Sequence, residues 1–286
     1  MDEAWPTAVP GTRFDRIRHL PAVDSTNDLV AEAARHGEAE GLVVATDYQR
    51  RGRGRLGRRW EAPPGANLLV SVLLRPRLGW SELHWATAAV ALAASEAVRT
   101  VAGVALVGKW PNDLLSPRGE KVAGVLAEAV GGTDAPSPAA VVVGLGLNVA
   151  WPTTSEALPE DLRGRVSSLV ALAGHRPSRP ELLQALLLGL EGWLVALAEQ
   201  DGRRRLRSAY EAWCATLGQE VRVELGHEVL LGRAEAVDEQ GALVVALGDG
   251  SRRVVAAGDV QHLRAAPRVP GEPRRAEDSR GRSGVP

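Results

Sequence analysis

The sequence contains almost no cysteine and little histidine, and both shortages exclude kinds of site. Cys214 is the single cysteine among 286 residues, so no disulfide can form within the chain and a reducing compartment is expected. The six histidines lie far apart, without the spacing of metal ligands. We therefore expect neither a disulfide scaffold nor a histidine metal centre.

The net charge is close to zero, and we expect neither a leader segment nor a membrane-spanning run. A formal net charge of −1 argues against a general nucleic-acid binder. The first residues, Met1–Pro6, do not resemble a signal peptide, and no apolar run looks long enough to span a membrane. We expect a soluble cytoplasmic protein with one large domain and one small domain.

Lysine is scarce although basic residues are plentiful. The chain has 34 lysines and arginines, and the only two lysines are Lys109 and Lys121. A compact ammonium on a flexible stem differs from the planar arginine fork. The surroundings of these two lysines are therefore candidate sites.

What the chain has in abundance is arginine, concentrated in one stretch. Residues 50–59 hold six arginines and three glycines, between Gln49 and Trp60. Glycine costs backbone entropy and like charges repel, so we predict a mobile loop that orders around an anion. Arginine forks and glycine N–H groups suit phosphate and carboxylate, and Trp60 offers a flat face. A merely solvated charged surface is the alternative at this point.

The letters of the same stretch match a dinucleotide-binding pattern, but the elements around it do not. Residues 52–57 fit G-x-G-x-x-G, and residues 41–47 before them resemble a strand. The motif also requires a following helix. Residues 61–65 contain two prolines, which prevent a helix there, so we reject this interpretation.

Hydrophobic periodicity divides the chain into units. Residues 1–217 mix helical and strand patterns, residues 218–265 contain short strands separated by turns, and residues 266–286 have the composition of a disordered tail. We expect helices at 25–36, 81–101, 178–200 and 203–217, and strands at 14–20, 41–47, 67–74, 119–128, 140–149, 220–225, 229–237, 243–247 and 252–256. Pro111 should interrupt a strand.

Polar groups gather at the ends of these elements. Ser25 with Asp28 forms a capping box, and Ser25, Thr26 and Asn27 either cap the helix or face a ligand. No nucleophile–base pair is evident. Cations and amides suit recognition of a carboxylate and a phosphate, as in formation of an acyl-adenylate, where alignment and charge neutralisation do most of the work.

Five motifs in this order resemble the biotin protein ligase family, over residues 20–265. They are Asp24–Asn27, Gln49 with the arginine stretch to Trp60, Lys109–Asp113, Lys121–Glu128 and 144–148. The resemblance implies an α/β (α+β) catalytic domain at 1–217, similar to class II aminoacyl-tRNA synthetases, and a C-terminal SH3-like barrel at 218–265. It implies that biotin and Mg-ATP give biotinyl-5′-AMP, and that the biotinyl group passes to a lysine of a biotin carboxyl carrier domain of an acyl-CoA carboxylase.

The resemblance also implies roles for individual residues. The biotin-binding set would be Ser25, Thr26, Asn27, Gln49, Arg53, Gly54, Arg55, Lys121 and Gly124. The ATP-binding set would be Arg58, Trp60, Lys109, Asn112 and Asn148, with Lys109 either structural or directed at phosphate. Lys121, Arg53 and Arg55 would be catalytic, and Asp113 would hold Mg²⁺ through water.

The sequence departs from the family pattern in two places, and two alternative functions are considered. Arg50 and Arg51 add charge where the family has small or uncharged residues, and no N-terminal DNA-binding domain is evident, so we expect a ligase without repressor activity. A lipoate-type ligase would share the fold and the chemistry, but the arginine stretch and the Lys109–Asp113 motif disfavour it. A nucleic-acid binder is disfavoured by the near-neutral charge.

Overall fold

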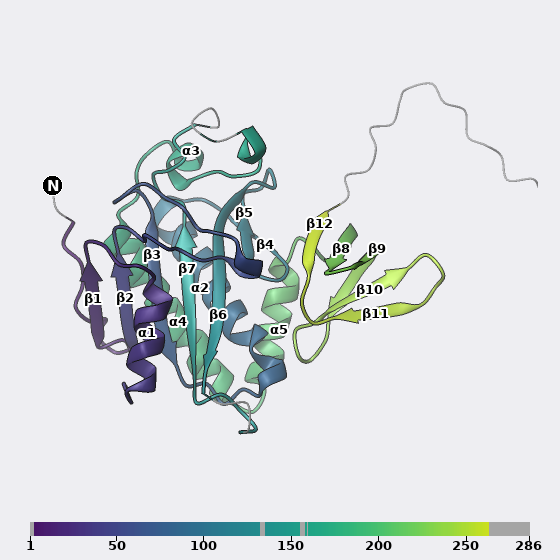
Figure 1. Cartoon of the computed structure of the whole chain (residues 1–286), viewed down its shortest axis with the longest axis horizontal. Helices are drawn as coiled ribbons and strands as arrows, with labels where there is room; N and C mark the ends of the chain where they lie inside the picture. The colour runs from purple at the N-terminus through teal and green to yellow at the C-terminus, as the bar shows by residue number, and fades with distance from the viewer. Residues whose placement is uncertain (1–2, 132–134, 155–157, 159, 263–286) are drawn as a thin grey trace, which may run out of the picture.

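The computed structural model describes residues 3–131, 135–154, 158 and 160–262, and shows two packed units (Figure 1). One is a seven-stranded sheet with helices on both faces, and the other is a five-stranded sheet. The predicted disordered tail at 266–286 lies outside the described residues, as does the end of the predicted barrel at 263–265.

The larger sheet has the order β1-β2-β3-β7-β6-β5-β4, in which β1 and β2 are parallel and the other neighbours antiparallel. Its strands are β1 (Arg16–Leu20), β2 (Leu42–Thr46), β3 (Leu68–Leu74), β4 (Val107–Lys109), β5 (Asp113–Leu115), β6 (Lys121–Val130) and β7 (Ala140–Leu147). The predicted edge strand is confirmed as β1. Pro111 lies between β4 and β5, so the predicted interruption is confirmed.

Alternation along the strands divides the core between the two faces of this sheet. Leu42 and Val44 of β2 pack with α1 (Thr26–Arg35), whereas Val43 and Ala45 join the larger cluster on the opposite face. That face is covered by α2 (His84–Ala102), α4 (Arg179–Ala198) and α5 (Gly202–Trp213) (Figure 1). The short α3 (Leu169–Ala173) was not predicted.

Helix α4 is long and apolar enough to cross a membrane by length and composition alone, contrary to our expectation. Core helices of soluble proteins pass the same test. Leu182, Leu183, Leu186, Leu187 and Leu190 are buried, and α4 packs along α2. We therefore describe α4 as a core helix of a soluble protein.

The smaller sheet has the order β11-β10-β9-β8-β12 and is entirely antiparallel. Its strands are β8 (Glu220–Leu225), β9 (Glu228–Val237), β10 (Leu243–Leu247), β11 (Arg252–Val255) and β12 (Asp259–His262). The four predicted strands are confirmed and β12 was missed. The predicted boundary after residue 217 falls between α5 and β8, but buried residues of both units form one continuous cluster, so the boundary stays a prediction.

Candidate functional site

The arginine loop, residues 50–60, is built on backbone hydrogen bonds rather than on regular structure. Arg50 N and Arg51 N donate to Val23 O and Asp24 O, both at 2.9 Å, which ties the loop to the start of α1. Trp60 N donates to Gly52 O at 3.0 Å and closes the loop. At its tip Leu56 has φ +56 and a largely exposed side chain. These hydrogen bonds give the loop a defined shape.

Five of the six arginines of this loop, all except Arg55, form ion pairs with described residues, which reduces the self-repulsion that we expected. Acidic side chains from four other segments meet the guanidinium groups. The ion pairs are Arg50 and Arg51 with Asp24, Arg53 with Asp28 and Glu128, Arg58 with Asp259, and Arg59 with Glu61. The hydrogen bond from Arg51 lowers the pKa of Asp24. The loop is thus held by several exposed ion pairs, each of which is individually weak.

The start of α1 carries a buried polar cluster around Thr26. Gln49 Oε1 accepts hydrogen bonds from Thr26 N at 2.8 Å and from Thr26 Oγ1 at 3.0 Å. Ser25 Oγ accepts from Asp28 N at 3.3 Å, so Ser25 caps the helix as predicted, while the return bond of the predicted capping box, from Ser25 N to Asp28, is not seen between these two described residues. Ser71 Oγ, from β3, lies 2.7 Å from Thr26 Oγ1. The structure therefore brings Ser25, Thr26 and Gln49 together, and their contact with biotin stays a prediction.

Asn27 links this cluster to the arginine loop. Its Nδ2 donates to Glu128 Oε2 at 2.6 Å, and the same carboxylate receives Arg53 at 3.0 Å. Gly144, on β7, has no space for a Cβ because Asn27 Oδ1 fills it. The side chain of Asn27 thus packs against the sheet and is 5% exposed. Its predicted contact with biotin has no free amide hydrogen-bonding group to support it.

Trp60 covers a glycine floor formed by β6 and β7. Gly124 and Gly146 are cross-strand partners, and a Cβ at Gly146 would overlap the indole ring. The indole Nε1 is buried and has no hydrogen-bond partner among the described residues. Trp60 thus lies at Gly124, whereas the predicted roles placed these two residues at opposite ends of the substrate, adenine and biotin. An unpartnered donor and a floor without side chains fit a bound polar ring.

Lys121, at the start of β6, lies beside this floor. Its Nζ is 2.7 Å from Asp113 Oδ1 and 5.5 Å from the centroid of the Trp60 ring. Asn112 Nδ2 donates to Val125 O at 2.8 Å, and Arg55 donates to Asn112 Oδ1 at 3.3 Å. Burial lowers the pKa of Arg55. The structure therefore brings together two predicted catalytic cations, Lys121 and Arg55, with Asn112 and Asp113.

Asn148 directly follows β7 and is held by hydrogen bonds within the protein. Its Oδ1 accepts from Asn67 at 3.0 Å, its Nδ2 donates to Ser167 O at 3.0 Å, and the residue is 4% exposed. Both polar atoms are thus engaged inside the protein, and the predicted contact of Asn148 with adenine stays a prediction.

Lys109, at the end of β4, takes part in no ion pair between described residues. Its charge lies near His262 of β12, where burial first, and then Lys109, lower the pKa of His262. The choice between a structural and a phosphate-directed role for Lys109 stays open.

No group of three or more His, Cys, Asp or Glu side chains that could hold a metal occurs among the described residues. A single carboxylate nevertheless suits Mg²⁺, which enters such sites with substrate phosphates and keeps several waters. Asp113 is compatible with that role, and its Mg²⁺ contact stays a prediction.

Three residues of the site were not predicted: Ser71, Glu128 and Asp259. Ser71 could have been noticed as a lone polar residue in the apolar run 68–74. Glu128 lies within β6 and could have been noticed as a charge after an apolar run on a strand. Asp259 gave no signal, because its partner Arg58 is 201 residues away in the chain.

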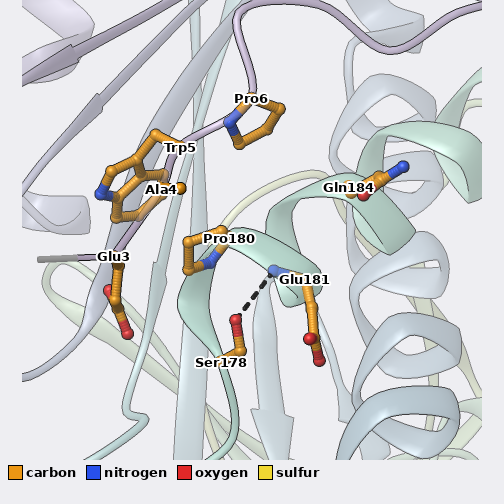
Figure 2. Close-up of a pocket in the computed structure, with 8 residues that line it drawn as sticks. All are labelled: Glu3, Ala4, Trp5, Pro6, Ser178, Pro180, Glu181 and Gln184. Carbon is orange, nitrogen blue, oxygen red and sulfur yellow. Dashed lines mark hydrogen bonds between the residues drawn. The ribbon is translucent and has the colours of Figure 1, made fainter. Parts of the chain in front are cut away.

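A hollow elsewhere in the molecule contains none of the predicted site residues. It has a volume of about 300 Å³ and lies between residues 3–6 and the start of α4 (Figure 2). Figure 2 shows Ser178 Oγ accepting from Glu181 N, which is the predicted helix cap. Beside it, Arg179 binds Glu3 and Asp47, so this region fastens the N-terminal segment to the end of β2.

Comparisons with known proteins match both units. The biotin/lipoate A/B protein ligase family matches residues 20–148, and the biotin protein ligase C terminal domain matches residues 216–263. A biotin–[acetyl-CoA-carboxylase] ligase of Mycobacterium tuberculosis is 37% identical over 263 residues, which cover 89% of this chain and 91% of that protein. A ligase of the same name from Paracoccus denitrificans is 33% identical, and the match covers 84% of this chain and 98% of the relative.

Solved structures share this fold. The biotin protein ligase from Aquifex aeolicus in complex with biotin and ATP has a TM-score of 0.73 and 27% identity, and the match covers 88% of this chain and all of that chain. Both units are therefore shared with that enzyme, and the five-stranded sheet corresponds to the predicted SH3-like barrel. The chain belongs to the biotin protein ligase family.

Proposed function

We propose that this protein attaches biotin to a lysine of a biotin carboxyl carrier domain, with ATP as the energy source. Near relatives carry the name biotin–[acetyl-CoA-carboxylase] ligase, and a similar solved structure holds biotin and ATP. The observation that carries the proposal is the grouping of Lys121 and Arg55, with Asn112 and Asp113, beside the glycine floor that Trp60 covers. The partners are a carrier domain of an acyl-CoA carboxylase and the small molecules biotin and ATP. We place the reaction in the cytoplasm, as the single buried cysteine suggests.

In the first step a carboxylate oxygen of biotin attacks the α-phosphorus of ATP, and pyrophosphate leaves as biotinyl-5′-AMP forms. Negative charge converges on the carboxylate and the phosphoryl oxygens. Lys121 leaves its ion pair with Asp113 and pairs with these oxygens instead, which neutralises part of their negative charge. The arginine loop supplies further cations. Preorganised cations of this kind are a large source of rate acceleration. Mg²⁺, when bound with ATP, would neutralise phosphate charge next to Asp113.

In the second step the neutral amine of the carrier lysine attacks the acyl carbonyl, AMP leaves, and an amide bond forms. The protein must hold the mixed anhydride away from water between the two steps. We assign that task to the arginine loop and to Trp60, whose indole already covers the floor at Gly124 and Gly146. Thr26 and Gln49 would face the ureido end of biotin.

The test supplies biotin or lipoate, each with Mg-ATP and a carrier domain. Biotin should release pyrophosphate and add the mass of one biotinyl group to the carrier. A carrier whose acceptor lysine is replaced by arginine should stay unmodified, and pyrophosphate should still appear. Modification by lipoate alone would overturn the proposal in favour of a lipoate-type ligase.

A further inference from the structure

One turn of the barrel enters the larger unit and meets two buried tryptophans. We call residues 238–242, between β9 and β10, the barrel turn. Trp85 Nε1 donates to Glu239 O at 2.8 Å, and Trp110 Nε1 donates to Gly241 O at 2.9 Å. Both indoles are almost completely buried. Both hydrogen bonds cross between the units. The one from Trp110 is buried, where losing it is costly, and the one from Trp85 is partly buried.

The barrel turn has a fixed shape of its own. Asp238 Oδ1 accepts hydrogen bonds from Gln240 N at 2.9 Å and from Ala242 N at 2.8 Å. A side-chain oxygen that binds the backbone two residues on mimics a backbone turn and holds it. This arrangement fixes the two carbonyls that the tryptophans bind.

Gly241 allows the barrel turn to approach closely. It has φ +83, and a Cβ there would overlap the imidazole of His84. That imidazole is itself packed edge-on against Tyr210, with ring centroids 5.0 Å apart. The barrel turn is therefore fitted against the larger unit and has no room to shift.

Trp110 connects this contact to the site. It directly precedes Pro111, Asn112 and Asp113, the segment in which Asn112 accepts from Arg55 and Asp113 pairs with Lys121. Trp110 N also donates to Thr216 Oγ1 at 3.0 Å, so the residue is held at its backbone and at its ring.

We propose that the barrel turn is a positioning element for adenylation: it fixes Trp110 and thereby places Asn112 and Asp113 opposite Arg55 and Lys121. Trp110, Asp238 and Gly241 act as positioning residues, and the chemistry belongs to the residues they place. The proposal rests on the proposed function, which it deepens by giving the barrel a part in the first step.

Trp85 supplies a matched control. It makes the same kind of hydrogen bond to the same turn and is buried to the same degree, but it stands on α2, which contributes none of the predicted site residues. Trp85→Phe and Trp110→Phe should therefore lower the unfolding temperature alike. Only Trp110→Phe should disturb the site.

The experiment measures pyrophosphate release by the full-length protein at varied ATP and biotin. In Trp110→Phe we expect kcat/KM for ATP to fall at least about tenfold and KM for biotin to change less than about twofold, because small misplacements of catalytic groups cost that much. Trp85→Phe should stay within about threefold of the unaltered protein for both substrates. Equal losses in the two variants would overturn the proposal.

A second pair of variants acts from the barrel alone. Asp238→Ala should lower kcat/KM for ATP as Trp110→Phe does. Asp238→Asn should keep normal activity, because its amide oxygen can still accept the hydrogen bonds from Gln240 N and Ala242 N. An asparagine variant as impaired as the alanine variant would contradict the positioning role.

Hydrogen exchange at residues 109–115 separates this inference from the proposed function. Exchange there should accelerate in Trp110→Phe and Asp238→Ala and not in Trp85→Phe. If the unaltered protein made no biotinyl-AMP, the proposed function would fail while exchange would still test the barrel turn. Unchanged exchange in both variants would overturn the inference even in an active enzyme.

Discussion

Lys121 is the residue on which most of the proposed chemistry depends. Its ammonium lies 2.7 Å from Asp113 and beside Trp60, so a substrate carboxylate can replace Asp113 with little movement. Asp113 thus acts as a counter-ion that keeps Lys121 at the site while no substrate is bound.

We expect Lys121→Ala to lower adenylation by about 10²- to 10³-fold, the usual effect of removing one preorganised donor to a developing charge. The measurement is pyrophosphate release at saturating biotin and ATP. Stability should change little, because the Lys121–Asp113 pair is partly exposed. Lys121→Arg serves as the comparison, since it keeps the charge and alters its shape. Near-normal release in the alanine variant would show that Lys121 is not central.

His84 gives the protein a defined sensitivity to acid. Burial lowers the pKa of His84 from 6.5 to about 4. In the unfolded chain the imidazole binds a proton more readily, so stability is highest above pH 6.5 and falls as the pH decreases toward 4. Between pH 7 and pH 5 this group alone should remove about 2 kcal/mol of the free energy of unfolding.

Urea denaturation of His84→Asn at the two pH values checks this expectation. The variant should be less stable at pH 7 and should lose less stability than the unaltered protein between pH 7 and pH 5. His227→Asn, at an exposed position, should keep the original pH dependence. An unchanged pH dependence in His84→Asn would show that another group is responsible.

Capping signals and the family resemblance named most of the residues that the structure brings together, and chain separation explains what they missed. Ser25 as a cap follows from local sequence, whereas Gln49 and Thr26 were grouped by the family resemblance across 23 residues. Ser71 meets Thr26 across 45 residues, and Glu128 meets Asn27 across 101 residues. The engagement of Asn148 with Asn67 depends on the pairing of β3 with β7, which no single-sequence pattern reveals.

Among the elements, the arginine loop combines exposure with a defined shape. Its arginines remain accessible to protease even though acidic side chains pair with them. Its anchor on the barrel is the ion pair of Arg58 with Asp259.

We expect trypsin to cut within residues 50–59 of the free protein, and biotin with Mg-ATP to slow this cutting because the loop then closes over its anions. Asp259→Asn should accelerate cutting in the free protein by releasing Arg58. Glu235→Gln, which removes an arginine partner inside the barrel, should not. The cutting rate is measured by mass spectrometry of the fragments. Equal cutting rates with and without biotin and Mg-ATP would contradict closure of the arginine loop over its ligands.

The elements themselves were predicted well where periodicity is long. The helices at α1, α2, α4 and α5 follow apolar spacing and capping residues, as do the longer strands. α3 and β12 span five and four residues, too few for a period to appear. The self-repulsion of the arginine loop was overestimated, because two of the acids that pair with it, Glu128 and Asp259, come from distant segments.

At the scale of the whole molecule, the two units share one core. Buried residues of the barrel, such as Val223 and Val245, belong to the same cluster as those of α2 and α4. The family resemblance predicted that the barrel is present. The composition did not indicate that the barrel shares a hydrophobic core with the larger unit.

Calorimetry should therefore show one cooperative unfolding transition for both units. Biotin with Mg-ATP should raise its midpoint, because ligands that bind only the folded state stabilise it by mass action. Two separate transitions, with only the first shifted by ligands, would show that the barrel folds independently.

The position of Trp60 also has a practical use. Its indole lies on the glycine floor beside the Lys121 ammonium, and its N–H has no partner among the described residues. A substrate that enters this space must change the polarity around that ring. Trp60 should consequently serve as a built-in fluorescent reporter, and subtracting the emission of Trp60→Phe would isolate its signal from the other seven tryptophans. Occupancy of the site could then be followed in real time, without a label and without turnover.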